Sequence, residues 1–218
     1  MELNIKKREI IIKLVYYGPA LSGKTTNLQA LHYFLQNGAA SDLLSLDTTN
    51  DRTLFFDLLP IEYISKSNFK VRFKLFTVPG QVIHLSTRKM VLKSADGVVF
   101  VADSQINQRK NNNYSYRDLL NNLRFNNLGG IPIVIQFNKR DLPSNEIIDE
   151  SEINTFAESL GTNVLRASAI NGNGVLETFS ELIKVSFDRL NLLYQFENKF
   201  GIYKTEILQG VFKNINNG

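Results

Sequence analysis

The chain has 218 residues, the length of one large domain or of one domain with an appendage. Its content of 43% hydrophobic and 21% charged residues excludes collagen-like, low-complexity and wholly disordered chains. The net charge of +4 is mild, so we expect no nucleic acid partner. Because cysteine is absent, disulfides, thiolate nucleophiles, thiolate metal ligands and lipid carried on a thiol are excluded, and two histidines are too few to favour a histidine-built zinc site.

Apolar runs in the sequence are short. None approaches the roughly 18 to 20 residues that a membrane-spanning helix needs. The charged residues at positions 6–9 are unlike the hydrophobic region of a signal peptide. We therefore expect a cytoplasmic protein.

Strand and helix patterns alternate along the chain. The apolar, β-branched run at 9–17 predicts a strand buried on both faces of a parallel sheet, and apolar residues recur at helical spacing within 24–36. Further strands are predicted at 61–64, 69–78, 97–103, 131–137 and 163–167, and further helices at 114–127, 149–160 and 175–194. This alternation predicts an α/β fold with a mostly parallel central sheet and helices on both faces.

A glycine-rich motif follows the first long strand. It fits G-x-x-x-x-G-K-[ST] with Gly18, Pro19, Ala20, Leu21, Ser22, Gly23, Lys24 and Thr25, and Thr26 comes next. Its place between a strand and a helix favours a phosphate-binding loop (P-loop) over an ordinary turn with a surface lysine. In such a loop Lys24 reaches the β- and γ-phosphate oxygens, and the Thr25 hydroxyl coordinates Mg²⁺.

A second motif, N-K-x-D, follows the strand predicted at 131–137. Asn138, Lys139 and Asp141 lie at its carboxyl end, where open α/β sheets bind ligands. The Asp141 carboxylate can accept hydrogen bonds from both N1–H and the exocyclic amine of guanine, and a buried Asp141 would be left unpaired by adenine. This favours GTP over ATP. The Ser168–Ala169 pair offers a backbone N–H to the guanine O6, although two small residues after a strand also suit a plain turn.

The sequence resembles the Ras-like small GTPases, and more narrowly the bacterial MglA family of polarity and gliding-motility GTPases. The words that carry this resemblance are VYYGP, GKTTNLQ, DRTLFFDLLP, TVPGQ, DGVVFVADSQ and NKRDLP, within residues 5–193. The resemblance implies the small-GTPase version of the P-loop fold and a guanine-nucleotide switch that uses GTP, GDP and Mg²⁺. It also implies a GTPase-activating partner of the MglB (Roadblock) class and effectors in polarity or motility, with concentration at a cell pole.

The resemblance also assigns two switch segments. In residues 48–60, Thr53 would close over Mg²⁺ and the γ-phosphate, and Arg52 would be an arginine finger supplied by the same chain. In residues 77–81, the Gly80 N–H would sense the γ-phosphate and Gln81 would orient the attacking water. Arg52 could instead be an exposed loop arginine, and Gln81 a plain loop glutamine. Nothing in the sequence fixes His84 as a general base.

Two residues depart from the general small-GTPase pattern. Thr77 stands where most of these enzymes place an aspartate that supports Mg²⁺ through water, although MglA-type sequences share the threonine. Ala20 replaces a loop glycine, and its methyl group would crowd the space where Gln81 and Arg52 meet the γ-phosphate. We therefore expect slow hydrolysis. A non-hydrolysing, GTP-bound scaffold is the alternative, and a P-loop kinase is disfavoured by the N-K-x-D motif.

The last residues read as an appendage to a GTPase domain at 1–193. Apolar residues of 194–218 lie at near-helical spacing, interrupted by Gly201 and Gly210, which predicts a short amphipathic helix. The appendage could pack against the GTPase domain, dock on a partner or make peripheral membrane contact, or be disordered. Lys204 and Lys213 supply too little charge for stable membrane anchoring. We expect a monomer when the chain is alone.

Overall fold

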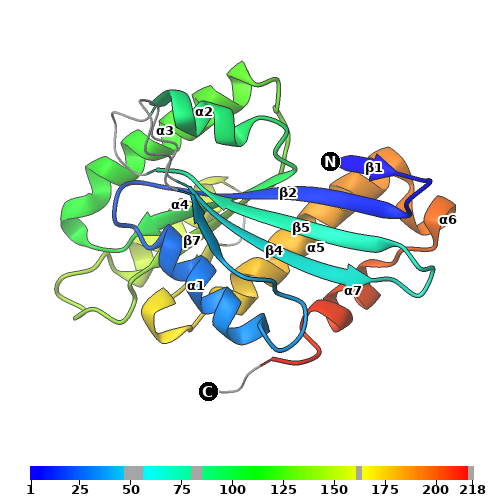
Figure 1. The fold of residues 1–218 in the computed structure, drawn as a ribbon. Helices are drawn as coiled ribbons and strands as arrows, with labels where there is room; N and C mark the ends of the chain where they lie inside the picture. Colours follow the sequence, from blue (N-terminus) through cyan, green and yellow to red (C-terminus); the bar gives the residue numbers. More distant parts are fainter. Residues whose placement is uncertain (47–55, 80–84, 161–163, 216–218) are drawn as a thin grey trace.

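Mostly parallel strands form the centre of the protein in this computed structural model, which describes residues 1–46, 56–79, 85–160 and 164–215 (Figure 1). In these residues the sheet order is β3-β4-β5-β2-β6-β7-β8, and β1 pairs with one end of β2. β1 and β3 pair antiparallel with β2 and β4, and β4 pairs antiparallel with β5, whereas the other neighbours are parallel. The strands are β1 (Glu2–Asn4), β2 (Glu9–Tyr17), β3 (Leu44–Leu46), β4 (Phe56–Ile64), β5 (Lys70–Thr77), β6 (Gly97–Asp103), β7 (Ile133–Asn138) and β8 (Val164–Arg166).

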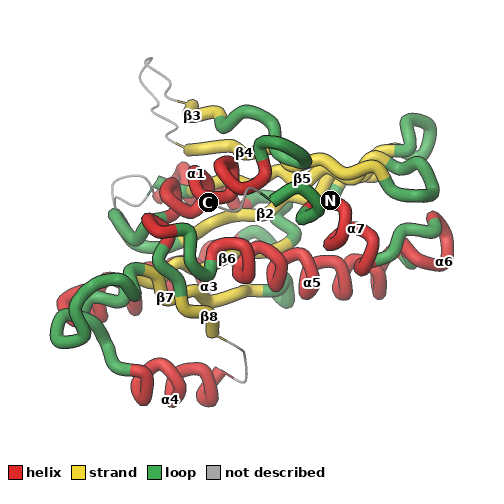
Figure 2. Tube along the Cα trace, turned by 90° about the horizontal axis from the view of Figure 1, so that it is seen from below, coloured by secondary structure: helices red, strands yellow, loops and turns green. Residues whose placement is uncertain are grey.

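Helices cover both faces of this sheet. Figure 2 shows α1, α5 and α7 on one face, and Figure 1 shows α2 and α3 on the other. The buried apolar residues also form two clusters. One includes Leu28 of the first helix and Phe179, and the other includes Leu92 and Leu119. The helices are α1 (Lys24–Leu35), α2 (Leu85–Leu92), α3 (Arg109–Phe125), α4 (Glu150–Leu160), α5 (Val175–Tyr194), α6 (Phe196–Phe200) and α7 (Lys204–Val211). The predicted α/β class is confirmed.

Buried strands were predicted best where the apolar run is unbroken. The bounds of β2, β6 and α5 are those that the sequence predicts, and every residue of β6 is buried. β4 differs, because it begins at Phe56 rather than at Ile61. Part of the segment predicted as a switch is therefore strand. Pro60, which disfavours a strand in sequence, is accommodated within β4, opposite Lys74.

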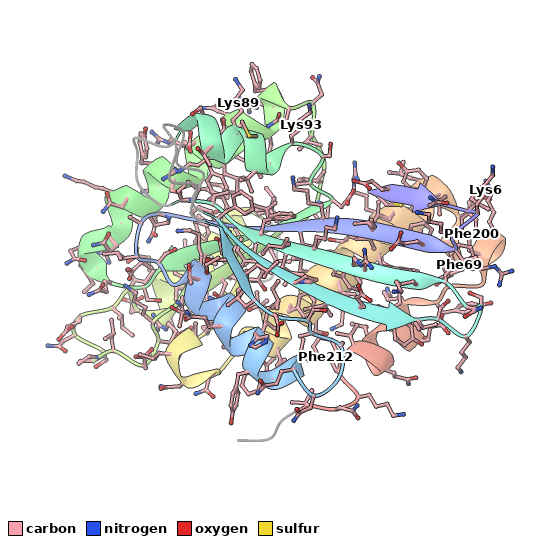
Figure 3. All side chains as sticks on the ribbon, viewed as in Figure 1. Lys6, Phe69, Lys89, Lys93, Phe200 and Phe212 are labelled. Atoms are coloured by element: carbon pink, nitrogen blue, oxygen red, sulfur yellow. The ribbon has the colours of Figure 1, made fainter. Side chains whose placement is uncertain are left out.

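The C-terminal residues pack against the rest of the chain. Phe196, Ile202, Ile207 and Val211 are at most 2% exposed and belong to the same core cluster as α1 and α5. Figure 3 shows Phe69 and Phe200 side by side at the far end of the sheet, with ring centroids 5.3 Å apart. Of the alternatives left open by the sequence, the structure thus favours packing of residues 194–215 on the rest of the chain.

Gly210 fits the tail closely to β4. A Cβ atom at this position would lie 1.9 Å from Cε2 of the Tyr63 ring, closer than any side chain can approach. The absence of a side chain at Gly210 is therefore what lets α7 lie on β4.

Candidate nucleotide-binding site

The carboxyl ends of β2, β5, β6, β7 and β8 meet at one edge of the sheet, where β2 leads into α1 in Figure 1. Both sequence motifs lie at this edge, because the P-loop follows β2 and N-K-x-D begins at the last residue of β7. Such an edge is the place where open α/β sheets bind ligands. The fold therefore brings together groups that are more than a hundred residues apart in sequence.

Two glycines allow the P-loop to wrap closely between neighbouring strands. Gly18 has φ +154°, and a Cβ atom there would lie 2.3 Å from the backbone oxygen of Val101 on β6. Gly23 has φ +96°, and a Cβ atom there would lie 2.1 Å from the side-chain nitrogen of Asn138. Neither position accepts another residue without a shift of the loop. Between them Ser22 is fully buried and its hydroxyl has no hydrogen-bond partner among the residues that the structure describes, whereas Leu21 points outward and is 87% exposed.

The Lys24 side chain folds back onto the backbone of the P-loop. Its ammonium donates hydrogen bonds to the backbone oxygens of Pro19, at 2.6 Å, and Gly18, at 3.2 Å. The side chain is buried, and burial lowers the pKa of Lys24 to about 7, assisted by the positive charge of Arg88 and opposed by Asp57. Burial penalises the charged form of an amine. An anion bound beside Lys24 would stabilise that charged form, so the site favours an anionic ligand.

An unexpected carboxylate holds the Thr25 side chain. The Thr25 hydroxyl donates to Oδ2 of Asp57 on β4 at 2.6 Å, and the Thr77 hydroxyl donates to the same oxygen at 2.9 Å. Ser45 donates to the other oxygen at 2.9 Å, and the Asp57 N–H donates to the Thr77 hydroxyl at 2.8 Å. The aspartate that Thr77 replaces in the general pattern therefore has a counterpart on the neighbouring strand.

Asn138 ties the P-loop to the loop after β8. Its side-chain nitrogen donates to the backbone oxygen of Ser22 at 2.8 Å, and its side-chain oxygen accepts from the N–H of Ala169 at 2.9 Å. The adjacent Lys139 ammonium pairs with Oδ2 of Asp103 at the end of β6, at 2.6 Å. These contacts join the carboxyl ends of β6, β7 and β8 into one side of the site.

Two details on this side differ from the expectations drawn from sequence. Asp141 is exposed rather than buried, and one of its oxygens accepts from the Ser168 hydroxyl at 2.6 Å. The N–H of Ala169 is donated to Asn138, whereas we expected it to be offered to a guanine base. Ser168 orients Asp141, a role that its sequence position did not suggest.

Some of the predicted site residues lie outside the described part of the chain. These are Arg52, Thr53, Gly80 and Gln81. His84, to which the sequence assigns no role, also lies outside the described part. Among described residues, Asp57, Ser45 and Asp103 are contributors that the sequence motifs missed. The one available signal was the carboxylate of Asp57 within the otherwise apolar run FFDLLP.

Comparison with known proteins decides the family. Residues 2–186 match the model of the ADP-ribosylation factor (Arf) family. The chain is 44% identical to the "Mutual gliding-motility protein MglA" of Myxococcus xanthus (strain DK1622) over 194 residues, which cover 86% of this chain and 96% of that protein. This chain is an MglA-type small GTPase.

As in other members of the Ras-like and Arf families, the MglA-type fold is an α/β fold that binds guanine nucleotide. The resemblance predicted from the sequence is confirmed. Within the described residues, no helix is both long and apolar enough to cross a membrane.

Proposed function

We propose that the chain binds GTP and GDP with Mg²⁺, hydrolyses GTP slowly to GDP and phosphate, and uses this cycle to control polarity or gliding motility. The observation that carries the proposal is the pair of hydrogen bonds made by Asn138, to Ser22 on the P-loop and to Ala169 after β8. These hydrogen bonds bring the phosphate-binding motif and the guanine-reading motif side by side in one site. A guanine held by Asp141 and phosphates held by Lys24 then belong to a single nucleotide.

The groups around Thr25 fit a magnesium ion, because they are hydroxyl and carboxylate oxygens, the ligand type that Mg²⁺ prefers. Thr25 donates its only hydroxyl proton to Asp57, so its oxygen lone pairs stay available to a metal. In this proposal Thr25 and Thr53 are the protein ligands, and Asp57 holds the Thr25 side chain in place. When bound, Mg²⁺ neutralises charge on the β- and γ-phosphates.

The remaining roles in hydrolysis fall to residues assigned by the family resemblance. Gln81 orients the attacking water, Arg52 offsets charge that develops on the transferring phosphoryl group, and Gly80 reports the γ-phosphate. A protein of the MglB (Roadblock) class would raise the rate. The name of the Myxococcus relative, which ties that protein to gliding motility, supports a motility output here.

Turnover of GTP by the purified protein tests this function, measured with Mg²⁺ alone and with an MglB-class partner. Arg52→Ala and Gln81→Leu are expected to abolish turnover without abolishing GTP binding. The matched control is Arg124→Ala, which removes an exposed arginine from the last turn of α3 and is expected to leave turnover unchanged. Tight GTP binding without turnover under any condition would instead identify the non-hydrolysing scaffold.

A further inference from the structure

A fully buried arginine, Arg88 of α2, lies between the end of β5 and α3. Its side chain is 1% exposed, and its Nε donates to the backbone oxygen of Pro79 at 2.9 Å. Its Nη1 donates to Oδ2 of Asp118 on α3 at 2.9 Å, and the guanidinium lies 5.6 Å from the centre of the Tyr17 ring. A buried cation is costly unless its charge and its N–H groups are matched, and here the neighbours match both.

The Asp118 carboxylate extends this arrangement to β2. Its Oδ2 also accepts a hydrogen bond from the Tyr17 hydroxyl, and its Oδ1 accepts from Asn122 at 3.1 Å. Asn122 donates to the Tyr17 hydroxyl as well, at 3.1 Å. Arg88, Asp118, Tyr17 and Asn122 thus form one partly buried network, which we call the Arg88 network.

The ends of the Arg88 network are the two backbone positions that precede the phosphate-facing segments. Tyr17 is the last residue of β2, directly before Gly18 of the P-loop. Pro79 comes directly before Gly80, to which the proposed function assigns the sensing of the γ-phosphate. The pairing of β2 with β5 sets the separation of these two segments up to Tyr16 and Val78. Arg88 adds a side-chain link beyond that ladder, because it holds the Pro79 carbonyl on one side and, through Asp118, the Tyr17 hydroxyl on the other.

We propose that Arg88 is a positioning residue for the γ-phosphate side of the nucleotide site, acting through Pro79 and through the Asp118–Tyr17 pair. The inference rests on the proposed function, because it concerns the same site. Small displacements matter in such a site, since a shift of about 1 Å in a positioned group can cost about a hundredfold in rate. GDP lacks the γ-phosphate, so its binding depends on this arrangement only through the P-loop end and is expected to change less than that of GTP.

A purely structural role for Arg88 is the competing explanation, because the network also joins α2 to α3. A second contact between the same two helices provides a matched control for this structural role. Asn126, the residue directly after α3, donates to the backbone oxygen of Lys89 on α2 at 3.1 Å, and this contact does not touch Pro79, Tyr17 or Asp118. Asn126 also donates to the backbone oxygen of Asn122 at 3.0 Å, but not to the Asn122 side chain, so Asn126→Ala loosens the same helix pair while the side-chain hydrogen bonds of the Arg88 network keep their partners.

The experiment compares Arg88→Lys, Asp118→Asn and Tyr17→Phe with Asn126→Ala in the full-length chain. Arg88→Lys keeps the charge but cannot hold Pro79 and Asp118 with one planar group, and Tyr17→Phe removes only a hydroxyl, so it keeps the test usable if the charge variants do not fold. The readouts are the dissociation constants for GTPγS and for GDP, kcat for GTP, and Tm.

Arg88→Lys and Asp118→Asn are expected to weaken GTPγS binding and to lower kcat by about tenfold each, while GDP binding stays within about twofold. Tyr17→Phe is expected to give a smaller loss with the same pattern. Asn126→Ala is expected to lower Tm and leave the ratio of GTPγS to GDP affinity unchanged.

Equal losses of GTPγS and GDP affinity, or an unchanged ratio in folded variants, would overturn the positioning role. A parent protein that binds both nucleotides but never hydrolyses GTP would refute the proposed hydrolysis alone, because the affinity ratio still decides the role of Arg88. Absence of any nucleotide binding by the parent would refute both proposals.

Discussion

From the contact between Asp57 and Thr25 we predict that Asp57→Asn weakens magnesium binding. In Asp57→Asn the Thr25 hydroxyl keeps an oxygen to which it can donate, but that oxygen is no longer charged. A hydrogen bond to a charged group contributes about 1.5 to 3 kcal/mol, against about 0.5 to 1.5 kcal/mol for a neutral one. The 2.6 Å contact between Thr25 and Asp57 therefore loses about 1 to 1.5 kcal/mol, or roughly tenfold in the affinity of a metal bound by Thr25.

The assay is the release of a fluorescent GDP analogue at increasing Mg²⁺ concentration. The concentration of Mg²⁺ that slows release by half is expected to rise about tenfold in Asp57→Asn, consistent with the loss that outer-shell changes commonly cause. Asp42→Asn makes the same charge change in an exposed loop and is expected to leave the midpoint unchanged. Ser45→Ala removes the contact to the other oxygen of Asp57 and is expected to have a small effect.

Two results would refute this reasoning. An unchanged midpoint in a folded Asp57→Asn protein would mean that the carboxylate does not support the metal ligand. A lower midpoint would mean that Asp57 competes with Mg²⁺ for Thr25, so that removing its charge frees the site. In either case the hydrogen bonds from Thr25 and Thr77 would serve only to hold β4 against the P-loop and β5.

Two further predictions concern Lys24 and the tail. Burial lowers the pKa of Lys24 to about 7, and bound phosphates would raise it, so nucleotide binding takes up a proton above pH 7. The affinity for GDP, measured by calorimetry, should thus fall about fivefold from pH 7 to pH 8, and a flat profile contradicts this. Gly210→Ala places a methyl group against the Tyr63 ring, at a cost of about 1 to 3 kcal/mol, and alanine favours the helix by about 1 kcal/mol, so urea unfolding should show a net loss of about 1 kcal/mol. A stability equal to that of the parent would show that α7 does not depend on this close approach.

The sequence predicts the frame of the site well, because its signals are local. The P-loop and N-K-x-D are short motifs whose place after an apolar strand can be seen without knowing what lies beside them. The bounds of β2 and β6 follow in the same way from nearly continuous apolar runs that are rich in β-branched residues. Asp57 could not be found by such signals, because its role depends on a cross-strand neighbour, Thr77, twenty residues away.

The burial of Arg88 could not be predicted from the sequence either. In sequence it is a charged residue in the stretch STRKM, indistinguishable from the adjacent lysine. Only the packing of α2 on α3 buries it and brings Asp118 and Tyr17 to it. The C-terminal tail is similar, since its helical spacing was visible but its docking on β4 required the position of Tyr63.

If the chain binds Mg²⁺ as proposed, the pairing of β4 with β5 supplies the carboxylate that position 77 lacks. The register that places Leu58 opposite Phe76 brings the next pair, Asp57 and Thr77, to the end of the two strands, beside Thr25. The carboxylate has thereby moved from the strand that leads to Gly80 onto the strand that follows Arg52 and Thr53 in sequence. Support of the metal ligand and placement of the first switch then depend on the same strand. On the proposed function, linkage then requires that whatever displaces β4 weakens Mg²⁺ binding, and that bound Mg²⁺ holds β4 with the same free energy.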